Sequence, residues 1–553
     1  MPDDARLNII PLGGMGEIGK NMMAIRYQDT IVVIDCGLMF PEDELLGIDV
    51  VIPDISYLIE NKEKVKAILL THGHEDHVGA LPFVLKEINP PIFGSKLTLG
   101  IVEGKLKENN LTNVKLNIVR PRDTIKIDQL EIEFFRVSHS IPDSLGIAIH
   151  TPLGIIFHTG DFKIDQTPVD GQVIDFRKMS ELGEKGVLVM LSDSTNADRP
   201  GFTQSEKVVG RTFDELFGRC EGRIIVTTFA SNVHRIQQVI DTAVKYGRKV
   251  AVVGRSMVNN VKISAQLGYI DIPENTMIEL EEINRYPPEK LVIATTGSQG
   301  EPMSALTRMA TADHRWVGID SGDTVIISAT PVPGNEKMVS KTIDLLFKQG
   351  AEVIYEREMG VHVSGHASQE ELKLVLNLIK PRYFIPVHGE SRHLMKHAKI
   401  AESLGIPHSR IFVVENGQIV EISKKRAQVI GKVTAGKILV DGLGVGDVGN
   451  IVLRDRRQLS QDGIMIVVVS INKETGEIVS GPDIVTRGFV YVRESEQLIE
   501  NSKLKVREAM EQSARKNITE WAVIKSQIRD KLGKHLFEVT GRRPMIMPII
   551  MEI

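Results

Sequence analysis

The stretch Ala-Ile-Leu-Leu-Thr-His-Gly-His-Glu-Asp-His, residues 67–77, joins an apolar run to a dense group of imidazoles and carboxylates. The run at 67–70 predicts a buried strand, and His or Asp fills four of the six positions from 72 to 77. His72 and His74 lie two positions apart, so an extended or looping backbone points both side chains the same way. Asp76 and His77 then face a neighbouring point. Two adjacent ligand pairs indicate two adjacent metal ions.

Four further apolar runs also stop at a histidine or an aspartate. They span 134–139, 154–161, 188–193 and 383–389, and they bring to predicted strand ends His139, Asp161, Asp193 and His388. Because the carboxyl ends of strands form the ligand-binding crevice of open α/β architectures, these residues can converge on one site. Imidazole and carboxylate without thiolate are the ligands of a hydrolytic metal centre. A solvated polar turn is the alternative for a lone histidine, and the clustering at 72–77 argues against it.

A centre with two metal ions needs about six to eight protein and solvent ligands, with the ions about 3.5–4 Å apart. His139, Asp161 and His388 complete that number when they join the group at 72–77. A carboxylate is the natural bridge, since each of its two oxygens can bind one cation.

The composition is that of a globular protein without a disulfide framework. Of 553 residues, 42% are hydrophobic and 25% are charged, and the length predicts about three to four domains. Cys36 and Cys220 are the two cysteines, which excludes a cysteine-rich zinc site and favours the cytoplasm. No apolar run reaches the roughly 18–20 residues of a membrane span, and the N-terminus lacks the layout of a signal peptide. A net charge of −5 argues against a nucleic-acid coat protein, while a local basic channel would still permit a nucleic-acid enzyme.

From about 205 to 360 the pattern changes to strands that alternate with helices. Strand-like runs lie at 223–231, 249–254, 291–298 and 323–329, and residues 232–246 carry helix-spaced apolar side chains. This pattern predicts βα repeats around a parallel sheet. Because candidate ligands lie both before and after it, we expect this segment to be inserted into another domain and to form the second wall of a cleft. The expected boundaries are 1–205 and 361–430 for the interrupted domain, 206–360 for the insertion, 431–450 for a linker and 451–553 for a last α/β unit.

Further local patterns yield predictions. Leu-Gly-Gly-Met-Gly-Glu-Ile-Gly at 12–19 is a weak dinucleotide fingerprint, because no clear crossover helix opens there, and a tight hairpin turn is favoured. Residues 31–35 form another buried run that ends in an acid. In the last unit we expect a strand at 464–470, a helix at 495–516 and a closing strand at 545–553.

The order His-x-His-x-Asp-His, followed by separate His, Asp and His, resembles the metallo-β-lactamase superfamily. Asp193, His366 in Ser-Gly-His-Ala-Ser and the inserted segment resemble its nucleic-acid branch, the β-CASP nucleases. Phe-Ala-Ser-Asn-Val-His-Arg (229–235), Thr-Gly-Ser-Gln-Gly-Glu-Pro (296–302) and the C-terminal domain narrow the resemblance to the bacterial ribonuclease J family. It covers essentially the whole chain, with every motif intact. The implied fold class is α/β: a metallo-β-lactamase αββα sandwich, an inserted parallel-sheet β-CASP domain and a small C-terminal α/β domain.

The resemblance implies a division of the metal ligands. By resemblance, one metal ion is bound by His72, His74 and His139, and the other is bound by Asp76, His77 and His388. Asp161 bridges the two ions. Zinc suits this set best, and manganese stays open because ligand type alone does not exclude it.

The resemblance also implies catalytic roles for two further residues. Asp193 would orient the nucleophile or a ligand histidine. His366 would contact the scissile phosphate or protonate the leaving oxygen. A satisfied histidine beside a glycine turn is the alternative for His366.

The family also binds a 5′-monophosphate beyond the metal ions. The matching positions are Ser231, Asn232 and Val233, with His362, Val363, Ser364, Gly365 and His366. A strand-end Ser-Asn at the start of a helix offers N–H donors and the positive end of a dipole; an ordinary helix N-cap is the alternative, and the two can coincide. The resemblance implies as well a structural cation such as Ca²⁺ at Gly47, Asp49 and Asp441, although exposed acids in turns are usually just solvated.

The function implied by the resemblance is a metal-dependent ribonuclease with 5′-to-3′ exonuclease activity, preferring a 5′-monophosphate, and with endonuclease activity. It would act in the cytoplasm on single-stranded RNA, in mRNA decay and ribosomal RNA maturation, as a dimer or tetramer, alone or with a paralogous subunit. A small-substrate hydrolase, a lactamase or thioesterase, is the alternative enzyme, but a small substrate does not require the long cleft of an inserted domain. A non-enzymatic partner subunit is the third reading, and the complete ligand set counts against it.

Overall fold

Two β-sheets form the interrupted domain in this computed structural model, which describes residues 6–42, 44–301, 303–332, 335–356, 359–473, 477–490, 495–515 and 520–553. The first sheet has the order β22-β21-β1-β3-β4-β6-β7-β8, with bounds Ala427–Lys432, Gln418–Ile422, Leu7–Gly13, Met22–Tyr27, Thr30–Ile34, Val65–Leu69, Ile92–Gly94 and Leu116–Ile118. The second has the order β19-β13-β12-β11-β10-β9, with bounds Tyr383–Val387, Val187–Asp193, Gly154–His158, Leu145–Thr151, Leu130–Arg136 and Thr124–Ile127.

The apolar core of this domain lies between the two sheets. Alternate residues of β1 and β10, among them Leu7, Ile9, Ile132 and Phe134, belong to one buried cluster. The other face of the six-stranded sheet is covered by α5 (Phe176–Lys185), α11 (Gln369–Ile379) and α12 (Ser391–Ser403). Helix α4 (Lys96–Glu108) packs on β7 and β8 of the eight-stranded sheet. Helices thus flank two stacked sheets, as the predicted αββα sandwich requires.

The inserted domain interrupts the six-stranded sheet between two neighbouring strands. Strands β13 and β19 pair in parallel, from Val189 with Tyr383 to Asp193 with Val387, although almost two hundred residues separate them. The sheet of the insertion is parallel throughout, in the order β15-β16-β14-β17-β18, with bounds Lys249–Val253, Leu291–Thr295, Ile224–Thr227, Thr324–Ile327 and Glu352–Ile354. The predicted βα repeats are therefore confirmed.

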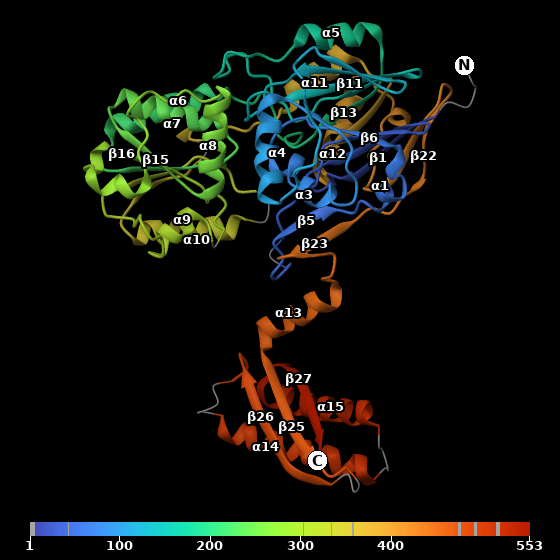
Figure 1. Ribbon diagram of the computed structural model, residues 1–553, viewed down its shortest axis with the longest axis vertical. Coiled ribbons are helices and arrows are strands. Elements are labelled where there is room, and N and C mark those ends of the chain that lie inside the picture. Colours follow the sequence, from blue (N-terminus) through green and yellow to red (C-terminus); the bar gives the residue numbers. More distant parts are fainter. Residues whose placement is uncertain are drawn as a thin grey trace. The chain divides into compact units, whose positions relative to one another are not determined.

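Helices cover both faces of the inserted sheet. Figure 1 shows α6 (Lys207–Arg219) and α7 (Val233–Lys245) on one face, and α9 (Ala305–Ala310) and α10 (Glu336–Lys348) on the other. A further helix, α8 (Arg255–Leu267), contacts α4 of the interrupted domain.

The glycine-rich stretch at 12–19 forms a turn between antiparallel strands. Strands β1 and β3 pair from Leu7 with Tyr27 to Gly13 with Met22. The short strand β2 (Met15–Gly16) lies between them, and Gly14 and Gly19 have φ angles of 85° and 113°. Such positive φ angles suit glycine, which has no Cβ atom. The two strands are joined as a hairpin, as predicted, but the connection is longer than a tight turn and contains β2.

The C-terminal unit, described by itself, joins residues 439–553 to residues 41–49. Its sheet has the order β26-β25-β27, with bounds Ile478–Arg487, Ile464–Ile471 and Met545–Glu552. Helices α14 (Glu496–Arg515) and α15 (Trp521–Thr540) cover one face of it. Lys516, the last residue of the helix predicted at 495–516, lies outside the described residues.

The stretch 431–450, expected to be a linker, contains regular structure. Strands β23 (Lys437–Asp441) and β24 (Gly444–Val445) pair in antiparallel fashion, with Val440 opposite Val445. Helix α13 (Asn450–Asp462) follows. In the part of the chain that the structure describes, no helix has the length and apolarity needed to cross a membrane.

Candidate metal centre

The ligand-type residues of the sequence stand at the carboxyl ends of strands. The group at 72–77 follows β6, with His74 as the N-terminal cap of a short helix, α2 (Glu75–Val78). The others stand at or just beyond the ends of β10, β12, β13 and β19: His139, Asp161, Asp193 and His388. The strand order brings these ends together, so residues more than three hundred positions apart meet at one edge of the sandwich.

His72, His74 and His139 bring three imidazole nitrogens together. The Nε2 atom of His72 lies 3.0 Å from Nδ1 of His74, and Nε2 of His139 lies 3.2 Å from the same Nδ1 atom. These spacings are close to about 3.3 Å, the edge of a tetrahedron whose zinc–nitrogen bonds are about 2.0 Å long. The three rings therefore fit one divalent cation.

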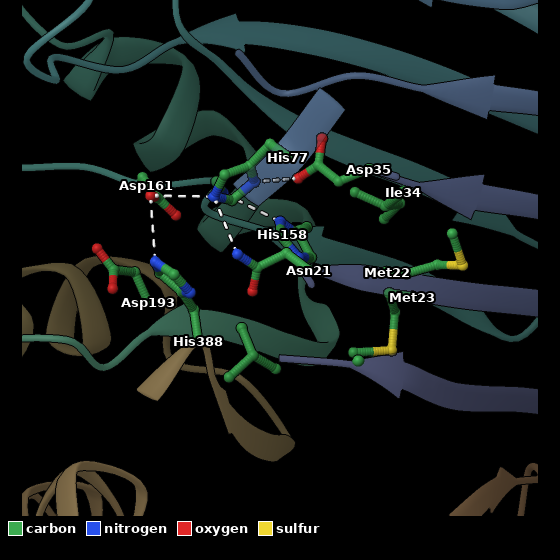
Figure 2. A pocket seen from close by; sticks show the side chains of 13 residues that line it. Asn21, Met22, Met23, Ile34, Asp35, His77, His158, Asp161, Asp193 and His388 are labelled. Carbon is green, nitrogen blue, oxygen red and sulfur yellow. Dashed lines mark hydrogen bonds and ion pairs between the residues drawn. The ribbon is translucent and has the colours of Figure 1, made fainter. Parts of the chain in front are cut away.

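The Oδ2 atom of Asp161 lies among four imidazoles. It is 3.2 Å from Nε2 of His77 and 3.3 Å from Nε2 of His388. It is also 3.7 Å from Nε2 of His72 and 3.8 Å from Nε2 of His139. Figure 2 shows His77 and His388 directed at this carboxylate. Asp161 is thus placed between the two sets of rings.

Among the described residues, three groups of side chains have ligand atoms within 4.8 Å of one another, and two of the groups share Asp161 and His388. The three groups are His72, His74 and His139; Asp76, His77, Asp161 and His388; and Asp161, Asp193, His366 and His388. The first two groups correspond to the two ligand sets expected from the sequence. The third leaves His366 and Asp193 close enough to be ligands, so geometry alone does not separate a metal-binding role from a catalytic one.

Neighbouring groups hold the ligand rings in place. Asp35, at the end of β4, accepts a hydrogen bond from Nδ1 of His77 at 2.7 Å. The same carboxylate accepts the N–H and the hydroxyl of Thr71, each at 2.8 Å. Nδ1 of His139 donates to the carbonyl oxygen of Gly365 at 2.8 Å. In both rings Nδ1 is the donor to these groups and Nε2 is directed toward the centre, which is how ligand histidines are commonly oriented.

Burial sets the protonation of the three-histidine group. It lowers the pKa of His72 and of His139 well below the ordinary value, and it lowers the pKa of His74 to about 4. These rings are therefore neutral at neutral pH, which is the form that binds a metal ion.

Carboxylates set the protonation of the other two ligand histidines. Burial disfavours the cationic form of both, but the charge of Asp161 outweighs it, raising the pKa of His388 to about 9 and that of His77 well above its ordinary value. Burial acts against ionisation of Asp161 too, yet His388 and His77 hold its pKa well below the usual range. Metal binding here would displace protons from both rings.

His366 is oriented by Asp193. Its Nδ1 atom donates to Oδ2 of Asp193 at 2.8 Å, and the other oxygen of Asp193 accepts the N–H and hydroxyl of Thr195 at 3.0 and 2.8 Å. Burial disfavours the His366 cation, but the Asp193 carboxylate outweighs it and raises the pKa of His366. The ring therefore holds a proton that its Nε2 atom can donate.

Three polar residues at the centre were not assigned from the sequence: Asp35, Asn21 and His158. Asn21 donates from Nδ2 to the backbone oxygen of Asp76 at 3.1 Å. His158 accepts the N–H of Gly160 at 3.0 Å, and burial lowers its pKa to about 4. All three line a cavity of about 20 Å³ behind His77 (Figure 2). Asp35 and His158 do carry a signal in the sequence, since each stands in an apolar run that ends in an acid.

The residues matched to the 5′-phosphate pocket lie on two segments joined by a buried arginine. Asn232 caps α7, where its Oδ1 accepts the N–H of Arg235 at 3.1 Å. Arg235 also donates to the carbonyl oxygen of Val361 at 3.4 Å, and its Nη1 lies 3.5 Å from Nδ1 of His362. The start of α7 and the segment 362–366 are therefore neighbours.

Among the described residues of these segments, the hydroxyl of Ser364 is a donor that the chain leaves available. The N–H of Val233 donates to the carbonyl oxygen of Ser231 at 2.9 Å, so it is already used. The Oγ atom of Ser364 accepts from Nδ2 of Asn196 at 2.8 Å and from the N–H of His366 at 3.2 Å, which leaves its own proton free to donate. Val363 is buried and the carbonyl of Gly365 bonds to His139, so these two residues anchor the segment to the rest of the domain.

A guanidinium occupies the region expected to hold a structural cation. The N–H of Gly442 donates to Asp49 at 2.7 Å. Arg456 of α13 forms an ion pair with Asp441 and donates to the carbonyl oxygen of Leu46 at 2.9 Å. A Cβ atom added to Gly47 would lie 2.8 Å from this guanidinium. Because Arg456 already supplies the positive charge, these residues do not fit an additional cation.

Comparisons with known proteins identify the family. A model described as "Metallo-beta-lactamase superfamily" matches residues 15–178, and "Ribonuclease J, beta-CASP domain" matches 221–346. "Zn-dependent metallo-hydrolase RNA specificity domain" matches 350–411, and "Ribonuclease J C-terminal domain" matches 451–553. The chain is 49% identical to ribonuclease J2 of Bacillus subtilis (strain 168) over 548 residues, 99% of each chain. The chain belongs to the ribonuclease J family.

Other matches agree with this assignment. Ribonuclease J 2 of Staphylococcus aureus (strain MRSA252) is 45% identical over 548 residues, which cover 99% of this chain and 98% of that one. A crystal structure of a protein of unknown function from Enterococcus faecalis V583 has a TM-score of 0.54 at 17% identity, covering 75% of this chain and 100% of that one, and shows a likeness of fold alone. Membership of the ribonuclease J family confirms the predicted fold and the predicted metal-dependent ribonuclease.

Proposed function

We propose that this ribonuclease J family member removes nucleotides from the 5′ end of RNA, prefers a 5′-monophosphate and also cuts internally. The observation that carries the proposal is the position of Asp161, whose Oδ2 atom lies 3.2–3.8 Å from nitrogens of four histidines. A carboxylate shared by two donor groups suits hydrolysis with two metal ions. Zn²⁺ matches the imidazole-rich donors best, and Mn²⁺ is the alternative.

The chain's own residues prepare the centre for hydrolysis. When bound, divalent cations lower the pKa of water to about 7 and offset the charge that develops on a reacting phosphate. Asp35 and the carbonyl of Gly365 fix the rings of His77 and His139, so that Nε2 of each would be available to hold a cation. His366, with Asp193 behind it, donates a proton from Nε2 to the leaving oxygen of the RNA.

Recognition of the 5′ end is assigned to the hydroxyls of Ser231 and Ser364. The two segments that carry them are joined by Arg235, and Ser364 keeps its proton free to donate. Hydroxyl donors suit a monophosphate dianion. A triphosphate is bulkier and more highly charged, so it fits such a pocket less well.

Digestion of one RNA that carries a 5′-monophosphate, a 5′-triphosphate or a 5′-hydroxyl tests the proposal, with the products resolved by length. Exonucleolytic decay should be fast on the monophosphate and slow on the triphosphate, while internal cutting should not depend on the 5′ group. Changing Ser231 and Ser364 together to leucine should impair the exonuclease more than the endonuclease. Equal exonuclease rates on both 5′ ends, or equal losses of both activities in the double variant, would contradict the pocket.

The setting of the activity is also part of the proposal. We place the enzyme in the cytoplasm, acting on single-stranded RNA in mRNA decay and ribosomal RNA maturation. We further propose a dimer or tetramer through the C-terminal unit, formed with itself or with a paralogous subunit. The exposed apolar side chains of β27, at Met547, Ile549 and Met551, support an interface there. Analytical ultracentrifugation of the protein measures the mass of the assembly and so the number of its subunits.

A further inference from the structure

The glycine-rich turn between β1 and β3 lies against the metal centre at two places. Its short strand β2 pairs with β20 (Gly389–Glu390), which directly follows His388. At the end of the turn, the backbone N–H of Asn21 donates to the carbonyl oxygen of Asp76 at 3.0 Å. The turn therefore borders one of the two ligand groups, called the second ligand set below: Asp76, His77, Asp161 and His388.

The side chain of Asn21 reaches two ligands of this set. Its Nδ2 atom lies 3.1 Å from the backbone oxygen of Asp76, 3.3 Å from Oδ2 of Asp76 and 3.2 Å from Nε2 of His77 (Figure 2). A carbonyl oxygen and a carboxylate oxygen can only accept, so they require the amide nitrogen of Asn21, and not its oxygen, on this side. The residue is 8% exposed, which shields these contacts from water.

Asp76 is the member of the second ligand set that most needs an anchor. Its side chain is 30% exposed, whereas those of His77, Asp161 and His388 are 2–4% exposed. The Oδ2 atom of Asp76 lies 3.4 Å from Nε2 of His77 and 3.8 Å from Nε2 of His388, which are ligands themselves. Within the described part of the chain, Asn21 is the donor to this oxygen that is not a ligand. Because ordering an exposed side chain costs conformational entropy, a fixed donor to the carboxylate favours metal binding.

The turn is built to hold the amide of Asn21 in one orientation. A Cβ atom added to Gly14, whose φ angle is 85°, would lie 2.4 Å from Oδ1 of Asn21, so the amide oxygen packs where only glycine leaves room. Behind the turn, Oε1 of Glu17 accepts from the buried ammonium of Lys20 and from Nδ2 of Asn416, each at 2.8 Å. These bonds tie the turn to its own domain, and the amide nitrogen is left directed at Asp76.

We propose that Asn21 is a positioning residue, whose amide holds the carboxylate of Asp76 in the direction that metal binding requires, with the glycine-rich turn as its frame. The inference rests on the proposed hydrolysis with two metal ions and deepens it. Groups that bond to metal ligands without binding the metal commonly set its affinity. The effect of Asn21 should therefore be confined to the ion held by the second ligand set, and the ion held by His72, His74 and His139 should not depend on it.

Titration of Asn21→Leu with Zn²⁺ against a chromogenic chelator tests this inference without relying on activity. Leucine branches at the same atom as asparagine but has no donor, and the backbone N–H of residue 21 still reaches Asp76, so the fold should be kept. Circular dichroism checks the fold. One Zn²⁺ ion should bind about 10- to 100-fold more weakly than in the wild type, and the affinity for the other ion should be unchanged. Asn21→Ala, which removes the amide without adding an apolar branch, should show the same selective loss.

A double-variant cycle shows whether Asn21 acts through Asp76. In an Asp76→Ala background the carboxylate is absent, so adding Asn21→Leu should weaken Zn²⁺ binding no further. Asn117→Leu is the matched control, because Asn117 also donates from Nδ2 to a backbone oxygen, that of Ile92 at 3.1 Å, on β8 of the same domain. This variant should bind both ions as the wild type does.

The outcomes separate this inference from the function beneath it. Two ions bound by the wild type, and bound as tightly by Asn21→Leu and Asn21→Ala, overturn the positioning role alone. Equal weakening of both ions, or a further loss in the Asp76→Ala background, overturns it as well, since Asn21 would then act on the fold and not through Asp76. A wild-type protein that binds a single Zn²⁺ ion overturns the proposal of two metal ions and the positioning role together.

Discussion

The metal centre and the charged network around Arg235 are both buried, but their polar groups are matched in different ways. At the centre, neutral rings face one another, with nitrogens of His74 and His139 only 3.2 Å apart. Around Arg235, donors face acceptors. Its Nε atom donates to Glu206 at 2.6 Å, and its Nη1 atom donates to the carbonyl and the hydroxyl of Ser328 at 2.8 and 2.7 Å.

This difference separates a site that needs an outside cation from a structural joint. Nitrogen lone pairs that converge on one point cannot bond to one another, and a metal ion is the partner that can bind them all. A buried arginine paired within the chain instead fixes the geometry around it. Arg235 links α7 to Glu206 and to the segment after β18, so it holds the wall on which 5′ recognition is proposed. The predictions below test this contrast.

The largest effect is expected from His77→Ala. His77 contacts Asp161 and Asp76, so its loss should remove a ligand and abolish RNA cleavage, while the folded structure is kept because the residue lies at the edge of the apolar core. RNA digestion, elemental analysis and circular dichroism measure the three properties. His408→Ala is the control, since the side chain of His408 is 93% exposed. Near-normal turnover of His77→Ala in metal-replete buffer would contradict the proposal of two metal ions.

A smaller loss is expected from His366→Ala. As a proton donor oriented by Asp193, His366 should contribute about 10²–10⁴-fold to the rate. The variant should keep its metal content, because His366 belongs to neither of the first two groups: His72, His74 and His139; and Asp76, His77, Asp161 and His388. Elemental analysis beside single-turnover cleavage distinguishes the roles. Loss of a metal ion would make His366 a ligand, as the third overlapping group allows, and the catalytic role would be wrong.

At the structural joint, Arg235→Met should lower stability rather than remove metal. Methionine keeps a long side chain but leaves the buried carboxylate of Glu206 without its arginine, which costs about 3–5 kcal/mol. Urea unfolding followed by the fluorescence of Trp316, in a Trp521→Phe background, reports on the domain that carries Arg235.

The control for this variant is an exposed ion pair. Arg177→Met breaks a contact with Glu181 in which the arginine side chain is 81% exposed, and it should change stability by no more than about 1 kcal/mol. Adding Glu206→Gln to Arg235→Met should recover part of the loss, because the unpaired charge is then removed. An Arg235→Met variant as stable as Arg177→Met would show that the network does not hold the wall.

The fold and the donor set were predictable because local patterns decide them. Buried runs that stop at His139, Asp161 or His388 show where strands end, and the glycines at 12–19 suit a hairpin turn whatever surrounds them. The parallel sheet of the insertion follows from strands that alternate with helices.

The supporting residues were harder to foresee because they depend on which strands are neighbours. Asp35 reaches Thr71 and His77 because β4 pairs with β6, with Ile34 opposite Leu69. The pairing of Arg456 with Asp441 likewise depends on how α13 folds back on its own unit. The run at 31–35 shows the same strand-end signal as the ligands, but it does not reveal that Asp35 serves a ligand rather than a metal.

The smallest of these effects is expected from Asp35→Asn, which leaves every ligand in place. Asp35 has a φ angle of 61°, a conformation that asparagine tolerates, so the backbone should not be strained. The amide can no longer hold the Nδ1 proton of His77 as a carboxylate does, and metal affinity should fall about 10- to 100-fold. Asp128→Asn is the matched control, since Asp128 also has a positive φ angle and accepts the hydroxyl of Thr30 at 2.6 Å. Metal titration monitored by RNA cleavage should show Asp35→Asn recovering at high metal concentration and Asp128→Asn unchanged. If both variants bind metal as tightly as the wild type, the bond between Asp35 and His77 has no part in holding the ligand, and the centre is organised by the strand ends alone.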